Sequence, residues 1–453
     1  MTSVDRSSDS LLKTYLIFLG PMIVSNILQA LSGTINNVYL GQMLGVGAMA
    51  AASAFFPLLF FCISFILGVG GGASVLIGQA YGARDFEKLK AVAGTALAVT
   101  LMLGLVIAVL GGLFTSELLI AIGTPADILA DATAYARVML IAMPAMFTFL
   151  LFTSMLRGVS DTLTPLLALG LSTLVGLLVT PALIKGWLGL PRLGVVSAAA
   201  AAVVSLIISL VWLAVHLRHR RNPLAPDADF LRHIRVEPRL LKAVLRIGLP
   251  MGVNLVMISL AEVAVLSLVN GFGSSATAAY GAVNQILNYV QFPALSISIA
   301  ASILGAQAIG RGRADQLGPI TRTGIQLNLV ITGTMVAVAY LFSRPVIGWF
   351  ITDEPVREMA QNLLHIILWS TLIFGCATLV AAVMRASGTV LIPTAISILC
   401  LTFVEVPVAW WLSRRMGIDG IWWAYPIAFT AMLVLQIVYY RTVWMKRPKE
   451  RLI

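Results

Sequence analysis

The segment Gln79-Ala-Tyr-Gly-Ala-Arg-Asp85 returns 228 positions later as Gln307-Ala-Ile-Gly-Arg-Gly-Arg313. Other pairs of residues keep almost the same offset: Pro21 with Pro250, Arg157 with Arg385, and Pro165 with Pro393. A constant offset across the chain predicts an internal duplication. Duplicated halves that consist of apolar segments are typical of transporters, in which the substrate path lies where the two halves meet.

The composition indicates a polytopic membrane protein, because 59% of the 453 residues are hydrophobic and only 11% are charged. Apolar runs of about twenty residues recur throughout, and the bilayer requires each run to satisfy its own backbone polar groups. We therefore predict an all-α fold with twelve transmembrane helices. The predicted spans are 16–40, 48–79, 91–115, 134–156, 163–185, 195–217, 240–270, 276–308, 320–343, 358–384, 391–413 and 420–444.

The distribution of Lys and Arg predicts the topology. Of the 30 basic residues, only Arg137, Lys185, Arg192, Arg344, Arg357, Arg414 and Arg415 fall on one side of the predicted spans. The positive-inside rule then places both termini in the cytoplasm. The repeat predicts an N-lobe (1–217), a cytoplasmic linker (218–239) and a C-lobe (240–453), related by a pseudo-two-fold axis along the membrane normal. Prolines at 223, 226 and 238 favour a linker that allows the two lobes to move.

Three segments resemble one known family: Pro21-Met-Ile-Val-Ser-Asn26, Gly68 to Asp85, and Leu156-Arg-Gly-Val-Ser-Asp-Thr-Leu-Thr-Pro165. Together with the weaker second copy at Leu249-Pro250 and Arg385-Ala-Ser-Gly388, they are similar to the multidrug and toxic compound extrusion (MATE) transporters. The resemblance covers essentially the whole chain. It implies two six-helix lobes around a cleft, and efflux of amphipathic, often cationic compounds driven by inward flow of H⁺ or Na⁺.

The chain departs from that family at the acidic positions of the N-lobe. Many members carry an aspartate in the first helix near the place where this chain has Asn36. Some carry a second one before a proline in helix 5, where this chain reads Thr180-Pro181. Neither Asn nor Thr can titrate, so coupling through N-lobe carboxylates is not expected here.

Two carboxylates, Glu262 in helix 7 and Glu405 in helix 11, are predicted to lie well inside the membrane. A charge at mid-bilayer costs at least about 2.5–3.5 kcal/mol, so these side chains should face the protein interior. The resemblance adds that another MATE branch has a glutamate in helix 7, about one turn nearer the proline. We predict a cation-coupling site at both residues. The alternative for Glu262 is a protonated residue that is hydrogen-bonded to a neighbouring helix. The alternative for Glu405, two residues before Pro407, is that it satisfies backbone groups freed by a kink.

Polar side chains also form two stripes at helical spacing. Asn26, Gln29 and Asn36 share a face of helix 1, while Tyr280, Asn284, Asn288 and Gln291 share a face of helix 8. Amides that faced lipid would have no hydrogen-bond partner, so both stripes should face the interior. We predict that they line the substrate cleft; interhelical hydrogen bonding within a lobe is the alternative. The tryptophans at 410, 411, 422 and 423 are expected to form an aromatic belt at the membrane interface.

The sequence gives no support for an enzyme. It has no HExxH motif, no phosphate-binding loop and no paired membrane aspartates, and the three cysteines fall in apolar runs without metal-ligand spacing. We expect no cofactor and no metal, H⁺ or Na⁺ as the coupling ion, a small amphipathic substrate and membrane lipid as partners, no nucleic acid, and a monomer. The alternatives are a lipid-linked precursor flippase, which needs basic residues in its cleft, and a receptor or scaffold that does not transport.

Overall fold

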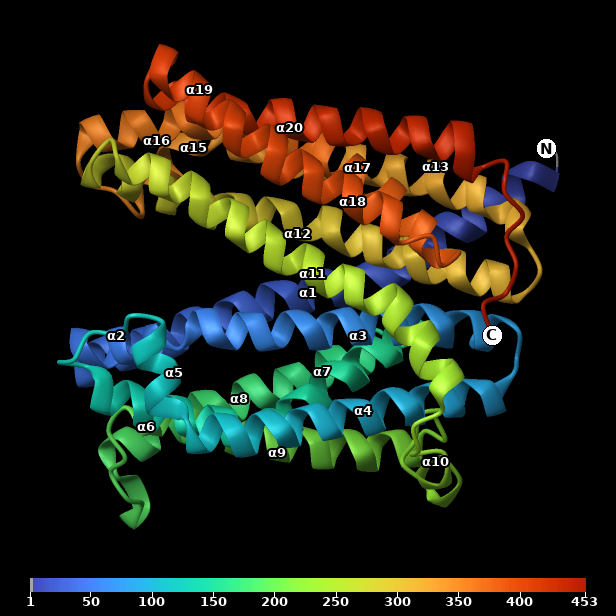
Figure 1. The fold of residues 1–453 in the computed structure, drawn as a ribbon, viewed down its shortest axis with the longest axis horizontal. Helices are drawn as coiled ribbons and strands as arrows, with labels where there is room; N and C mark the ends of the chain where they lie inside the picture. Colours follow the sequence, from blue (N-terminus) through green and yellow to red (C-terminus); the bar gives the residue numbers. More distant parts are fainter. Residues whose placement is uncertain (1–2) are drawn as a thin grey trace. The chain divides into compact units, whose positions relative to one another are not determined.

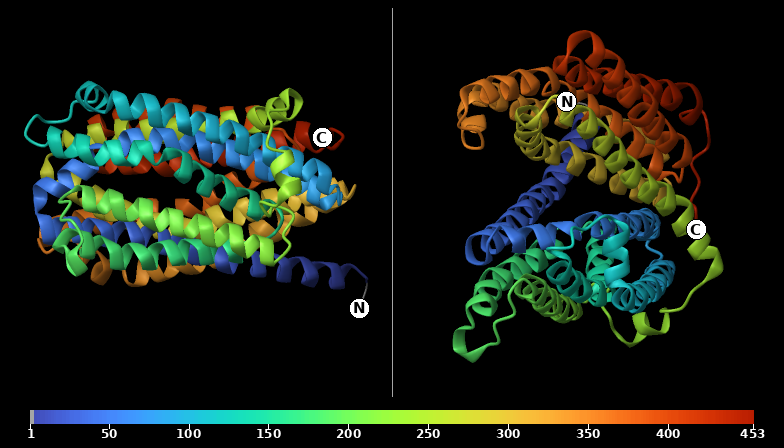
Figure 2. Two further views of the ribbon diagram at one scale, coloured as in Figure 1. Left: turned by 90° about the horizontal axis from the view of Figure 1, so that it is seen from below. Right: turned by 60° about the vertical axis from the view of Figure 1, so that its left-hand side comes forward.

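The computed structural model describes residues 3–453, which are helical and contain no strand (Figures 1 and 2). Ten helices are long and apolar enough to cross a membrane. Two further helix pairs are bent by 54° and 42°, and counting each pair as one span gives up to twelve. The predicted all-α fold and its number of spans are confirmed.

Residues Val24–Leu249 form one compact unit, which we call the N-unit. Its α3, α4, α7, α8 and α9 run alongside one another (Figure 1). Its helices within this range are α2 (Val46–Ala54), α3 (Phe56–Gly82), α4 (Phe86–Leu113), α5 (Thr115–Ala121), α6 (Leu129–Ile141), α7 (Met143–Gly158), α8 (Leu163–Lys185), η1 (Trp187–Gly189), α9 (Val196–His219) and α10 (Ala228–Arg232).

Pro250–Leu452 form a second unit, the C-unit, together with the start of the chain up to Ile23. Three of its helices contain π-helical segments, which are wider turns with one extra residue. Its elements are α12 (Ser274–Gly310), η2 (Ala314–Gln316), α13 (Leu317–Leu327), η3 (Asn328–Thr332), α14 (Gly333–Leu341), α15 (Ser343–Gly348), α16 (Glu354–Ile367), α17 (Ser370–Ala386), α18 (Leu391–Leu399), η4 (Cys400–Glu405), α19 (Val406–Met416), α20 (Ile418–Tyr439) and η5 (Tyr440–Trp444).

The duplication is visible in the packing of each unit. In the N-unit α3 packs against α7, and in the C-unit their counterparts α12 and α17 pack in the same way. The bent pairs also correspond, because α6 and α7 break at Ala142 while α16 and α17 break at Leu368 and Trp369. The repeat in sequence is therefore a repeat of helix packing.

Two long helices, α1 (Ser3–Leu44) and α11 (Pro238–Asn270), are each shared by both units. The start of α1 packs in the C-unit, where the buried Tyr15 hydroxyl donates a hydrogen bond to the Ile320 carbonyl (2.9 Å). The start of α11 packs in the N-unit: a Cβ on Gly72 would lie 2.5 Å from the Val244 carbonyl oxygen. The lobe boundaries 1–217 and 240–453 describe the repeat and stay a prediction. The packing units differ from these lobes because the start of α1 belongs to the C-unit and the start of α11 belongs to the N-unit.

The segment between the halves is packed against the N-unit. We call residues 222–237 the strap. Phe230 is fully buried beside Phe152, and Thr95 Oγ1 of α4 donates a hydrogen bond to the Arg235 carbonyl (3.1 Å). A Cβ on Gly94 would lie 2.0 Å from the His233 carbonyl oxygen, so the strap touches the α4 backbone. A buried aromatic side chain and backbone contacts hold this segment on the N-unit, and its role as a linker that allows the two lobes to move stays a prediction.

Close backbone packing of α11 on α3 predicts the effect of one added methyl group. In Gly72→Ala the new Cβ would meet the Val244 carbonyl, a backbone atom that cannot rotate away. We expect a loss of about 1–3 kcal/mol in stability, measured as a lower melting temperature of the purified protein. Gly281→Ala, on α12 with open space around the added atom, is the control. Equal melting of the two variants would contradict this packing.

Candidate functional site

The C-unit holds a cavity of about 130 Å³ on which both predicted membrane carboxylates converge. Glu262 reaches it from α11, and Glu405 reaches it from the end of η4. Asn284, Asn288 and Gln291 of α12 also line it, as predicted from their spacing. The remaining lining residues are Ile258, Ala261, Leu287, Ile367, Phe374, Leu401, Tyr425 and Phe429.

The two carboxylates differ in exposure. Glu405 is 2% exposed, and its Oε2 has no hydrogen-bond partner within the described residues. Glu262 is exposed at the cavity surface. A buried carboxylate oxygen without a donor is costly as a bare anion, so it favours a proton or a bound cation. The assignment of Glu405 to cation coupling, and the alternative in which it satisfies backbone groups freed by a kink, both stay predictions.

Tyr280 joins the site indirectly. Its hydroxyl lies 3.0 Å from that of Tyr425, which lines the cavity, although Tyr280 itself does not. The Trp422 ring stacks on Tyr280 with 5.7 Å between centroids and is fully buried. Trp422 is therefore not a membrane-belt residue, and that expectation is wrong for it because its ring completes the core. Trp410 is half exposed and carries the Arg414 guanidinium 4.0 Å from its ring centroid, as an interfacial residue would.

The N-unit holds a second cavity, of about 270 Å³, whose lining contains no Asp, Glu, His, Lys or Arg. Asn36 and Thr180 both line it, and the Oγ1 of Thr173 is buried there without a hydrogen-bond partner. The Tyr39 hydroxyl donates to the Leu177 carbonyl (3.3 Å). The predicted loss of charge in the N-lobe thus coincides with a polar but neutral cavity.

The other two residues of the helix 1 stripe do not reach this cavity. Asn26 is half-buried and Gln29 is exposed, and neither is among the lining residues. Helical spacing predicted one shared face, but the cavity extends along only part of that face. Their assignment to the cleft stays a prediction.

The two cavities occupy equivalent positions of the repeat. Gly33 lines the N-unit cavity, and Glu262, 229 positions later, lines the C-unit cavity. Leu177 and Glu405 correspond in the same way at an offset of 228. Further equivalent pairs are Ser32 with Ala261, Met139 with Ile367, Met146 with Phe374, and Thr173 with Leu401. One ancestral pocket therefore exists twice, with carboxylates in the second copy only.

Comparison with known proteins decides the family, because the sequence profile described as MatE matches residues 21–182 and again 250–411. The chain belongs to the MatE family. The two matched ranges are the two halves of the duplication, so the resemblance found in the motifs is confirmed. A curated relative, "Probable multidrug resistance protein YoeA" of Bacillus subtilis, is 45% identical over 450 residues, covering 99% of this chain and 97% of the relative.

More distant relatives and solved structures agree with this MatE assignment. "Multidrug export protein MepA" of Staphylococcus saprophyticus is 23% identical, covering 95% of this chain and 94% of the relative. A crystal structure of a mutant of the Vibrio cholerae MATE transporter VcmN matches with a TM-score of 0.90 at 20% identity, covering 98% of this chain and 99% of that one. At that identity the likeness shows the fold alone.

Sequence reasoning did not single out two polar side chains of this MatE protein's C-unit, Asn254 and Tyr425, of which Tyr425 lines the cavity. Asn254 precedes Glu262 by eight residues on α11, and its Oδ1 is buried without a hydrogen-bond partner. The spacing 254, 258, 262 was available as a signal. Tyr425 lies in an apolar run, and only the structure places its hydroxyl near Tyr280. His365 is not among the cavity-lining residues, and Ser343 Oγ lies 3.2 Å from its Nε2.

The tyrosine pair predicts a measurable difference between two hydroxyls on α20. Tyr425→Phe removes the partner of the Tyr280 hydroxyl and should cost about 1 kcal/mol of stability. Tyr439→Phe removes a buried hydroxyl without a partner, so it should be neutral or stabilising. Thermal melting of both variants checks this, and a larger loss for Tyr439→Phe would contradict the described contacts.

Proposed function

We propose that this MatE protein is a secondary active exporter of amphipathic, cationic organic compounds in antiport with H⁺, with Na⁺ as the alternative ion. The observation that carries this proposal is the cavity of the C-unit, which is lined by exposed Glu262 and by buried Glu405, whose Oε2 has no hydrogen-bond partner within the described residues. The printed names of relatives support export, since YoeA is called a probable multidrug resistance protein and MepA a multidrug export protein.

In the proposed mechanism, these two carboxylates hold the coupling ion. Loading Glu405 with a proton or cation removes the cost of an uncompensated buried charge, whereas unloading restores it. Glu262, at the exposed edge of the cavity, is suited to bind either the ion, taken up from water, or a cationic substrate. Ion and substrate would then compete for the same negative charge, which is the basis of antiport.

The neutral cavity of the N-unit would serve substrate binding without titration. Its hydroxyl and amide groups, including Asn36 and Thr180, can bind polar atoms of a substrate, and its apolar walls can hold rings. Because no carboxylate lines it, its affinity should not depend on the coupling ion. This division assigns coupling to the C-unit and part of recognition to the N-unit.

Alternating access requires elements that belong to both units. The unit boundaries fall inside α1 after Ile23 and inside α11 before Pro250, each next to a proline of the repeated pair Pro21 and Pro250. Proline removes one backbone hydrogen bond and permits bending. We propose that both helices bend here when the transporter changes state, so that ion binding in the C-unit alters access for the substrate.

We further propose a bacterial cytoplasmic membrane location with both termini inside, from the distribution of basic residues. The protein should work as a monomer without a cofactor and should not be an enzyme. The runner-up function, a flippase for lipid-linked precursors, needs cations for phosphates, but no Lys or Arg lines either cavity. A receptor or scaffold would have no use for paired cavities.

The experiment that tests this function is uptake of a fluorescent organic cation into proteoliposomes under separately imposed H⁺ and Na⁺ gradients. Uptake driven by one of the two gradients, and dissipated by an ionophore for that ion, is the expected result. A flippase would instead move a lipid-linked substrate, and a receptor would show no gradient-dependent flux.

Removing the titratable groups should separate folding from coupling. Glu262→Gln keeps the shape of the side chain, so it should abolish gradient-driven uptake while leaving the melting temperature near that of wild type. Glu405→Gln should also reduce driven uptake, by at least about tenfold if the buried group holds the ion. Glu354→Gln, at an exposed ion pair with Arg344, is the control. Wild-type driven uptake in Glu262→Gln would refute its role.

The neutral cavity predicts a different phenotype for Asn36→Ala. Substrate affinity should fall about fivefold, as expected for a lost hydrogen bond of about 1 kcal/mol. The dependence of uptake on the ion gradient should be unchanged, because coupling is assigned to the C-unit. The apparent KM and the dependence on pH or Na⁺ are measured together; loss of ion dependence would move the coupling site to the N-unit.

A further inference from the structure

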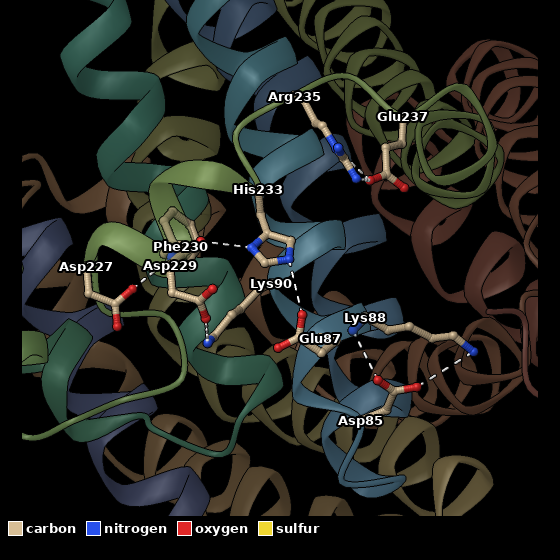
Figure 3. Close-up of polar contacts among 10 residues, drawn as sticks. All are labelled: Asp85, Glu87, Lys88, Lys90, Asp227, Asp229, Phe230, His233, Arg235 and Glu237. Atoms are coloured by element: carbon tan, nitrogen blue, oxygen red, sulfur yellow. Dashed lines mark hydrogen bonds and ion pairs between the residues drawn. The ribbon is translucent and has the colours of Figure 1, made fainter.

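Each acidic side chain of the strap already makes a contact, either within the strap or with α4 (Figure 3). Asp229 pairs with Lys90 of α4, and this hydrogen bond lowers the pKa of Asp229. Asp227 caps α10 by accepting from the Phe230 amide (2.8 Å), and Glu237 lies 2.9 Å from Arg235. The imidazole of His233 bridges the Asp229 carbonyl (2.9 Å at Nδ1) and Glu87 of α4 (3.4 Å at Nε2). Each acid of the strap is therefore already paired or capping.

Several cations around the strap have no ion-pair partner. Among the side chains that the structure describes, in residues 10–453, six exposed basic residues make no ion pair: Arg220, Arg221, Arg232, Arg239, Lys242 and Arg246. Exposed apolar side chains lie among them in sequence, with Leu231 at 53% and Val236 at 41% exposure. This exposed stretch of the chain therefore carries positive charge and hydrocarbon close together in sequence.

At the start of α11, basic and then apolar side chains follow one another along a single face of the helix. Arg239, Lys242, Arg246 and Leu249 follow at spacings of three, four and three residues, so they lie on the same side of the helix. All are exposed, and the face changes from basic to apolar at Leu249, which is 49% exposed. A helix face that is basic and then apolar matches the polar-to-hydrocarbon boundary of a bilayer.

We propose that this basic face of α11, together with the outer surface of the strap, binds the headgroup of an anionic glycerophospholipid. A lipid phosphate supplies the negative charge that the strap's own acids do not, and the adjacent acyl chains match Leu231, Val236 and Leu249. A soluble anion would satisfy the charges but would leave these side chains in water. Nucleic acid would offer no hydrocarbon, so the pattern favours lipid.

Binding here has a structural consequence. The same turns of α11 contact α3 through the close approaches of Val244 to Gly72 and of Gly248 to Gly68. A lipid held by Arg239, Lys242 and Arg246 would fix the opposite, exposed side of these turns. It should therefore stabilise the packing of α11 on the N-unit, independently of whether the protein transports drugs.

The test is titration of the purified, detergent-solubilised protein with phosphatidylglycerol, read by native mass spectrometry and by thermal melting. Phosphatidylcholine with the same acyl chains is the neutral comparison. We expect phosphatidylglycerol to bind more tightly and to raise the melting temperature. Each removed cation should weaken binding about fivefold. Lys242→Gln alone, and the triple variant Arg239→Gln, Lys242→Gln and Arg246→Gln, measure this.

The control removes three exposed cations from the end of the chain, in Lys446→Gln, Arg447→Gln and Arg451→Gln. Its affinity for phosphatidylglycerol should match wild type. An equal loss in the control and the triple variant would show general attraction to charge and overturn the proposal. Equal binding of phosphatidylcholine, or full displacement of the lipid by inorganic phosphate at low millimolar concentration, would also overturn it.

Discussion

The constraint on which this structure depends is that the hydrocarbon of a bilayer offers no hydrogen-bond partner. It forces the backbone of the membrane spans into helices, and it makes a polar side chain inside a span costly unless the protein supplies a partner. Several of these polar side chains line two cavities, one in each unit. Glu405 is the extreme case, because its Oε2 is buried and lacks a partner. Because this oxygen has no fixed hydrogen-bond partner, a proton or a cation that binds reversibly can stabilise the Glu405 carboxylate.

Duplication followed by divergence explains how one pocket acquired two chemistries. Equivalent positions line both cavities, yet Gly33 and Leu177 in the first copy are Glu262 and Glu405 in the second. The backbone diverged as well, since η3, η4 and η5 all lie in the second copy and no π-helical turn occurs in residues 3–250. Glu405 ends η4, and π turns are frequent at functional sites. The asymmetry of chemistry and that of helix geometry therefore occur in the same copy.

The spans, the duplication and the two membrane carboxylates were predictable because a bilayer allows few kinds of sequence inside it. The length of the apolar runs predicted the membrane spans, and the constant offset between similar segments predicted the duplication. The cost of a buried charge singled out Glu262 and Glu405 before any contact was known. Periodicity also placed Asn284, Asn288 and Gln291 on one face, and these residues do line the C-unit cavity.

The sequence does not show which other element packs against a given helix face. Asn26 and Gln29 share a face with Asn36, but the N-unit cavity does not extend to them. Trp422 has the position of an interfacial residue, and only the partner ring of Tyr280 shows that it is core. The prolines of the strap indicate only that the helix is interrupted there, whereas the structure shows Phe230 packed beside Phe152 of α7 and the strap backbone in close approach to Gly94 of α4. In each case a long-range contact overrides a local pattern.

The central claim, that the carboxylates of the C-unit hold the coupling ion until substrate displaces it, is tested most directly by ion release. Purified protein in weakly buffered detergent solution is mixed with a cationic substrate, and the release of protons or of radioactive Na⁺ is measured per molecule bound. The account predicts stoichiometric release from wild type and none from the double variant Glu262→Gln, Glu405→Gln, with substrate still bound. Undiminished release from that double variant would contradict it.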